Sequence, residues 1–124
     1  MELEWLAQEF SVGKWPANTA DRNVCHDFWF YAKTDQEVSI LCPSAEIPQD
    51  ATSYEHHWRG FRVSGQLEFS LVGILSKIAG ALAEAKISIF AVSTFDTDYI
   101  FIKKENQALA QKTLELAGWR FLSS

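Results

Sequence analysis

The clearest hydrophobic pattern lies in the second half of the chain. Residues 57–65 (HWRGFRVSG) alternate apolar and polar positions, which is the period of a half-buried strand, and Gly65 ends the run. Residues 66–86 then carry apolar side chains at helical spacing, namely Leu71, Ile74, Leu75, Ile78, Leu82 and Ala85. The pattern predicts a strand followed by a helix, with Ser70 as the helix N-cap.

Two further strands are predicted after this helix. Residues 87–95 (ISIFAVSTF) and 99–104 (YIFIKK) are rich in Ile, Val and Phe, and the loop between them spans 96–98. The favoured two-residue hairpin turns use Asn-Gly or Asp-Gly because they need positive φ, yet this loop contains no glycine. On pattern alone, we interpret Asp96 and Asp98 first as solvated turn residues whose side chains bond the backbone.

A second helix and a last strand complete the order. Asn106 can cap a helix that runs to Ala117, and Gly118 stands where glycine commonly ends a helix. The apolar positions of this helix include Leu109, Leu114 and Leu116. The final strand is WRFLS (119–123). The order strand, helix, strand, strand, helix, strand is the ferredoxin-like α+β pattern, an antiparallel sheet with both helices on one face.

The first half of the chain has a weaker pattern. Residues 2–14 contain strand-like material, and 28–33 and 38–42 resemble two strands across a turn. The stretch 43–50 (PSAEIPQD) predicts a loop or a short helix. A degenerate copy of the ferredoxin-like module fits if the stretch 17–25 (ANTADRNVC) forms its first helix.

Composition limits the classes of function. The chain has 124 residues, of which 48% are hydrophobic and 22% charged, as in a folded globular protein. Its formal charge of -5 argues against sequence-independent nucleic-acid binding, which needs clustered Lys and Arg. No stretch is apolar enough to span a membrane, and the acidic start MELEWLAQEF does not resemble a secretory signal. We expect a cytoplasmic protein whose abundant aromatic residues lie mostly in the core.

The side chains that could bind metal or a cofactor form no recognisable motif. Adjacent histidines on an extended segment, such as His56 and His57, point to opposite sides, and no CxxC or HxxxH spacing accompanies Cys25-His26. No glycine-rich phosphate loop is present. We therefore expect no metal and no cofactor, and we expect Cys25 and Cys42 to remain thiols in a reducing compartment.

The predicted start of the first helix could receive an anion. Unsatisfied backbone N–H groups and the helix dipole make such an end a receptor for a carboxylate or phosphate, although every helix has one. Gly73 lies about one turn inside this predicted helix and costs about 1 kcal/mol relative to alanine. Close packing on the sheet is the commoner reason for such a glycine, and close approach of a ligand is the other.

The segment from Gly65 to Phe121 closely resembles an ACT domain of the kind found in small bacterial tandem-ACT proteins and in cytosolic arginine sensors. The resemblance rests on FSLVGIL opening the first helix, on the S-T-F-x-x-D core of AVSTFDTDY, and on Lys-Lys-Glu before the second helix. It implies an ACT domain at 58–124 and a divergent ACT-like module at 1–57. Residues 27–43 are similar to the matching strand pair of the tandem proteins.

The resemblance also implies a ligand site, since ACT domains are regulatory modules that usually hold an amino acid where two modules pair. The family positions carry over to Glu68, Thr94, Phe95 and Asp98, and the helix start adds Phe69, Ser70, Leu71 and Val72. Asp98 would meet an ammonium or guanidinium group, whereas Asp96 would only shape the turn. Arginine sensors have a glutamate where this chain has Leu71 and a glycine where it has Glu68, so arginine specificity is not implied.

Three classes of function remain open at this point. The first is a non-enzymatic amino-acid sensor that pairs as a homodimer and passes its signal to a protein partner that the sequence does not name. The second is a dimerisation module whose pocket is vestigial. The third is a small enzyme that uses Asp96 and Asp98, and no nucleophile, metal or cofactor motif supports it.

Overall fold

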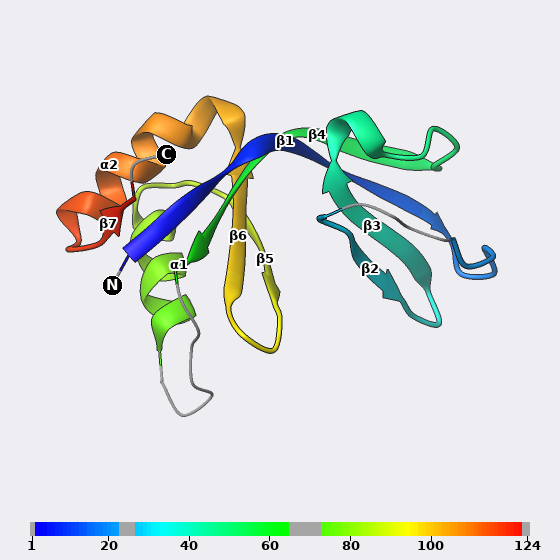
Figure 1. Ribbon diagram of the computed structural model, residues 1–124, viewed down its shortest axis with the longest axis horizontal. Coiled ribbons are helices and arrows are strands. Elements are labelled where there is room, and N and C mark those ends of the chain that lie inside the picture. The colour runs from blue at the N-terminus through cyan, green and yellow to red at the C-terminus, as the bar shows by residue number, and fades with distance from the viewer. Residues whose placement is uncertain (1, 23–26, 65–72, 123–124) are drawn as a thin grey trace. The chain divides into compact units, whose positions relative to one another are not determined.

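The computed structural model describes residues 2–22, 27–64 and 73–122 of the chain (Figure 1). The chain divides into two compact units. The first, here called the C-terminal unit, consists of Met1–Ala7 and Trp58–Ser124. The second, here called the inserted unit, consists of Gln8–His57. The first seven residues therefore belong with the C-terminal unit, although the whole inserted unit separates them from it in sequence.

The C-terminal unit has the predicted ferredoxin-like α+β order. After β4 (Ser53–Val63) come α1 (Ile74–Glu84), β5 (Ile89–Ser93), β6 (Asp98–Lys103), a short 3₁₀ turn η2 (Lys104–Asn106), α2 (Gln107–Leu116) and β7 (Arg120–Phe121). β6 lies between β4 and β5 and pairs antiparallel with both. Both helices pack on one face of the sheet (Figure 1).

The N-terminal residues add a strand to this sheet. β1 (Glu2–Pro16) neighbours β4, and its first residues pair parallel with β7, Glu2 with Arg120 and Leu3 with Phe121. An ion pair between Arg120 and Glu2 accompanies this register. Within the C-terminal unit the strand order is therefore β7-β1-β4-β6-β5.

The core of the C-terminal unit lies between the sheet and the helices. Alternate positions of the central strands meet one face of each helix there, and the buried set is Leu3, Phe61, Val63, Ile78, Leu82, Ile87, Ile100, Ile102, Ala110 and Leu114. Of the three leucines predicted as apolar positions of α2, only Leu114 is buried, since Leu109 and Leu116 are 48% and 80% exposed. An α-helix completes one turn every 3.6 residues, so Ala110 and Leu114 share the inner face and the other two leucines lie on other sides of the helix.

The start of α1 differs from the prediction. The helix begins at Ile74, and its N-cap is Gly73 in the left-handed conformation at φ 85°, so the predicted N-cap, Ser70, is wrong. A Cβ atom on Gly73 would meet nothing within 4 Å, which excludes tight packing as the reason for this glycine within the described residues. The positive φ explains it, because side-chain-bearing residues rarely adopt that conformation. Gly118, at φ 101° after α2, confirms the predicted helix end.

Gly60 in β4 provides a test of the packing. A Cβ atom there would lie 2.5 Å from Cε1 of Phe101, whose ring is fully buried. We expect Gly60→Ala to lower the free energy of unfolding by about 1–3 kcal/mol, because the buried ring must shift. Gly80→Ala is the matched control: it faces open space inside α1 and is expected to be neutral or stabilising by up to about 1 kcal/mol. Urea unfolding of both variants measures the difference, and equal losses would contradict it.

The inserted unit is built on strands. β3 (Glu37–Pro43) pairs antiparallel with the second half of β1, and β2 (Phe30–Lys33) pairs with β3 on its other side. These strands and the short 3₁₀ turn η1 (Ser44–Glu46) confirm the predicted pattern of this region. The prediction of a helix at 17–25 is wrong for residues 17–22, which form a turn and irregular chain. The rest of that stretch lies outside the described residues. The amide N–H of Thr19 donates to the carbonyl of Pro16 at 3.0 Å and closes that turn.

A small second core holds the inserted unit together. Trp15, Val38, Ile40 and Cys42 are buried in it, with Trp29, Ile47 and Ala51 packed against them. Burial, with a smaller contribution from the charge of Glu46, raises the pKa of the Cys42 thiol to about 12. Cys42 is a free thiol, and Cys25 lies outside the described residues. A neutral, buried thiol of this kind packs as a small hydrophobe and is a poor nucleophile.

Candidate functional site

The turn between β5 and β6 is closed by threonines. The amide N–H of Thr94 donates to the carbonyl of Thr97 at 2.9 Å. The Thr94 hydroxyl donates to the same carbonyl at 3.1 Å and lies 3.3 Å from the amide nitrogen of Thr97, which donates to it. The turn therefore spans Thr94–Thr97, not the predicted 96–98, and the closing hydrogen bonds explain how it forms without glycine.

Asp98 is the first residue of β6 and is half-buried. Its Oδ1 accepts a hydrogen bond of 2.5 Å from the hydroxyl of Ser93, the residue directly opposite on β5. None of the ion pairs between described residues includes Asp98. The structure thus orients a carboxylate at this end of the sheet and leaves its charge without a cation from the described part of the chain.

The same turn is tied to the end of β4. The Thr97 hydroxyl donates to the carbonyl of Val63 at 2.8 Å, close to where the chain enters residues 65–72. Figure 1 shows the start of α1 at the same end of the C-terminal unit as the β5–β6 turn. Thr94 and Phe95 lie on this turn, where Phe95 is 77% exposed. The structure therefore brings Thr94, Phe95 and Asp98 to one end of the sheet, beside the entry to the predicted helix-start segment.

The other predicted contacts belong to the segment before α1. Glu68, Phe69, Ser70, Leu71 and Val72 lie outside the described residues. The structure describes α1 from its N-cap, Gly73, onward. No side chain of a described residue caps this helix start, and its first turn carries no acidic residue. The partial positive charge of the helix end is therefore not neutralised by the first turn of α1.

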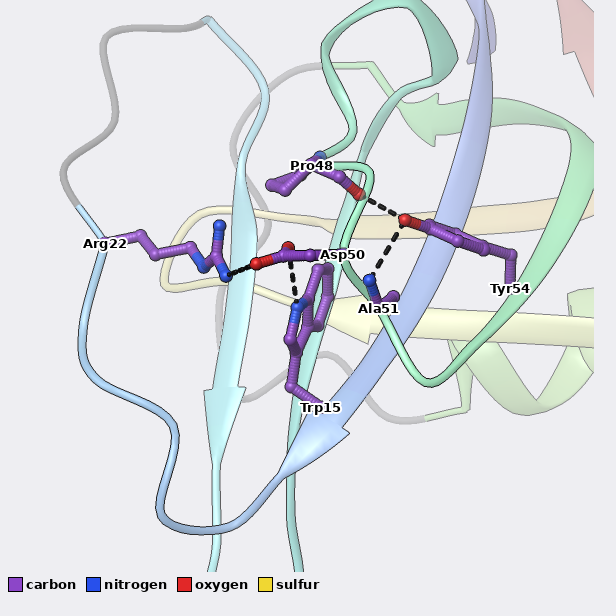
Figure 2. Close-up of polar contacts among 6 residues, drawn as sticks. All are labelled: Trp15, Arg22, Pro48, Asp50, Ala51 and Tyr54. Atoms are coloured by element: carbon purple, nitrogen blue, oxygen red, sulfur yellow. Dashed lines mark hydrogen bonds and ion pairs between the residues drawn. The ribbon is translucent and has the colours of Figure 1, made fainter.

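Two sets of polar contacts lie around a loop of the inserted unit, and one of them links the loop to β1 (Figure 2). The residues involved are Trp15, Arg22, Pro48, Asp50, Ala51 and Tyr54. Asp50 accepts hydrogen bonds from Arg22 at 2.7 Å and from the Trp15 indole at 3.1 Å, and both lower the pKa of its carboxyl group, Arg22 more strongly. The Tyr54 hydroxyl donates to the Pro48 carbonyl at 2.5 Å and accepts from the Ala51 amide at 3.1 Å. The groups within each set satisfy one another, so both sets serve to fix the loop.

The histidines form contacts that the sequence did not indicate. His56 Nδ1 lies 2.7 Å from the hydroxyl of Ser11, which lies 2.7 Å from that of Ser44. Ser11 is fully buried, so its hydroxyl is not presented to a substrate. The two imidazole centroids are 6.1 Å apart, and the opposite orientation expected for His56 and His57 is wrong because His57 has a positive φ of 68°. No group of three possible metal ligands occurs among residues 2–22, 27–64 and 73–122.

No helix in the described part of the chain is long and apolar enough to cross a membrane.

Comparison with protein families and curated proteins gives consistent matches. The model of a family described as ACT domain matches residues 53–115. The human cytosolic arginine sensor for mTORC1 subunit 1 is 43% identical over 110 residues, covering 83% of this chain and 33% of that protein. The mouse protein of the same name is 31% identical over 111 residues with the same coverage. The chain thus spans about a third of the length of these relatives.

Solved structures with a similar fold include a bacterial protein and an aspartokinase. An Agobacterium tumefaciens protein of known crystal structure is 28% identical with a TM-score of 0.89, covering 98% of this chain and 91% of that one. A structure of aspartokinase alpha and beta subunits is 18% identical with a TM-score of 0.69, covering 94% of this chain and 97% of that one. The second likeness concerns the fold alone.

Proposed function

This chain belongs to the ACT domain family, and on that basis we propose that it is a non-enzymatic regulatory module that binds a small amino acid-like ligand. The family model covers the β5–β6 turn and the start of α1. Two relatives are named as arginine sensors. The observation that carries the proposal is Asp98, an oriented carboxylate that forms no ion pair with the described basic residues.

The proposed ligand contacts combine this turn with the helix start. Thr94, Phe95 and Asp98 would contact the ligand from the turn, and Glu68, Phe69, Ser70, Leu71 and Val72 from the segment before α1. Asp98 would pair with the ligand's ammonium group through a charge-assisted hydrogen bond. Backbone N–H groups near Ser70–Val72 would receive its carboxylate, helped by the dipole of α1. Phe95 and Phe69 would wall the pocket.

The ligand need not be arginine. By the resemblance, this chain has Leu71 where the arginine sensors have a glutamate, and Glu68 where they have a glycine. The acidic side chain therefore stands at a different position in this sequence. The contacts that remain, a carboxylate at Asp98 and backbone donors at a helix start, suit the α-amino and α-carboxylate groups common to all amino acids. We propose an amino acid-like ligand without assigning its side chain.

The proposal extends to assembly. We take residues 1–57 as a divergent ACT-like module, whose first seven residues are part of the C-terminal unit, and 58–124 as an ACT domain. The ligand would be held where ACT modules pair. The working unit would be a homodimer in the cytoplasm, since two-fold dimers are the commonest assemblies. Its output would pass to a protein partner.

A thermal-shift screen against the twenty amino acids tests the proposal. A ligand that binds only the folded state stabilises it by about 2.7 kcal/mol at 100 times its Kd, which raises the melting temperature measurably. We expect a clear shift from one amino acid or a few related ones. No shift across the panel, with the protein folded, would reject the sensor and favour a dimerisation module with a vestigial pocket.

A further inference from the structure

The outer face of α2 carries an apolar stripe. Four large hydrophobic side chains are exposed in the described part of the chain, and two of them, Leu109 and Leu116, lie on this one helix. They are separated by two helical turns and so lie nearly above one another. The buried residues Ala110 and Leu114 lie on another side of α2, about a third of a turn from the stripe. The ten-residue helix is therefore apolar on its inner face and again along part of its outer face.

Charged residues beside the stripe are arranged in a complementary way. Lys112 lies between the two leucines in sequence, and Glu115 lies one turn further along the same exposed surface. Neither side chain takes part in an ion pair between described residues, and Glu115 accepts only a 3.4 Å hydrogen bond from Gln111. Both charges are thus available to a partner.

We propose that the outer face of α2 binds the same face of a second copy of this chain, with the two helices antiparallel. In that arrangement Leu109 of each copy packs against Leu116 of the other, and both leucine contacts form at once because the spacing is the same in both directions. Lys112 of each copy then lies near Glu115 of the other, so the charges attract. A two-fold parallel arrangement would instead place the two Lys112 side chains on opposite flanks of the contact, and the two Glu115 side chains likewise, so this attraction would not form.

The size of this face predicts a concentration-dependent dimer. α2 has ten residues and is about 15 Å long, so the contact lies at the low end of interface areas. Each substitution in a two-fold interface acts twice. Replacing Leu116 by glutamine is therefore expected to weaken dimerisation at least about hundredfold, because an apolar side chain of this size is lost from both sides.

Sedimentation equilibrium from about 10 to 500 μM tests the inference with a charge-swap series. We expect the natural chain to dimerise, and Lys112→Glu alone and Glu115→Lys alone each to weaken the dimer. The combination K112E with E115K is expected to restore it, because the attraction returns with reversed signs. Far-UV circular dichroism verifies that each variant retains its helices. Ala83→Gln, at an exposed position of α1 outside the proposed contact, is the matched control and is expected to change little.

Three results would overturn the inference: a chain that stays monomeric over this range, a dimer that Leu116→Gln leaves unchanged, or a double variant that is no better than the single ones. A dimer that survives all stripe variants would use another surface. The inference rests on the homodimer of the proposed function but not on its ligand, because all samples are free of added amino acids. Its failure is therefore distinguishable from failure of the thermal-shift screen.

Discussion

Replacing Asp98 by asparagine is expected to weaken binding of an amino acid ligand by about ten- to hundredfold. A hydrogen bond to a charged partner contributes about 1.5–3 kcal/mol, and asparagine removes the charge while keeping the shape. The Ser93 hydroxyl can still donate to the side-chain oxygen of asparagine at position 98, so the local geometry is retained. Isothermal titration calorimetry with the ligand found by thermal shift measures the loss.

Asp96→Asn is the matched control for this prediction. Asp96 is an exposed residue inside the same turn, two positions away, and it carries the same charge. We expect its variant to bind within about twofold of the natural chain, which screening of exposed charges by solvent and salt allows. Equal losses in the two variants would refute the separate roles of the two aspartates. Unchanged binding by the Asp98→Asn variant would mean that another residue supplies the counter-charge of the ligand.

Leu114→Ala should lower the free energy of unfolding by about 2–5 kcal/mol. The side chain is fully buried between α2 and the sheet, so its truncation loses apolar burial and leaves a cavity that the core fills only partly. Leu116→Ala, on the same helix and of the same chemistry, is expected to cost no more than about 0.5 kcal/mol because that side chain is 80% exposed. Urea unfolding monitored by circular dichroism compares the two.

The comparison must be made at a few micromolar, where association through α2 does not add to stability. If Leu116→Ala is as costly as Leu114→Ala under these conditions, then the rotation of α2 about its axis differs from that described. If Leu114→Ala is nearly neutral, the helix does not pack on the sheet through this residue. Either result would also remove the basis for the outer stripe of α2.

Much of the C-terminal unit could be predicted from local pattern. The strand predicted at 57–65 overlaps β4, the helix predicted within 66–86 contains α1, which begins only at Ile74, and Gly118 ends α2 as expected. These signals are local because strands and helices have fixed periods of two and 3.6 residues. The S-T-F-x-x-D core placed three of the proposed site residues on one hairpin. Their ligand contacts remain a prediction.

Contacts between distant residues depended on the tertiary structure. The pairing of Glu2 with Arg120 brings the first residues of the chain into a sheet whose other strands follow the inserted unit. Ser70 is a good N-cap in isolation, yet the helix begins after Gly73, whose positive φ only glycine tolerates well. Residues 17–22 form no helix, although one is predicted for the stretch 17–25. Its local helix propensity is weak, so packing with the rest of the chain decides its conformation.

The sequence by itself determined the types and order of the elements in the C-terminal unit, since each depends on the spacing of neighbouring side chains. Only the tertiary structure decided which leucines of α2 are buried and which threonines close the β5–β6 turn. It also decided that the Asp98 carboxylate is oriented by Ser93 from the opposite strand. The physical reason is that exposure and hydrogen-bond partners are properties of surfaces brought together by folding, and residues far apart in sequence supply those surfaces.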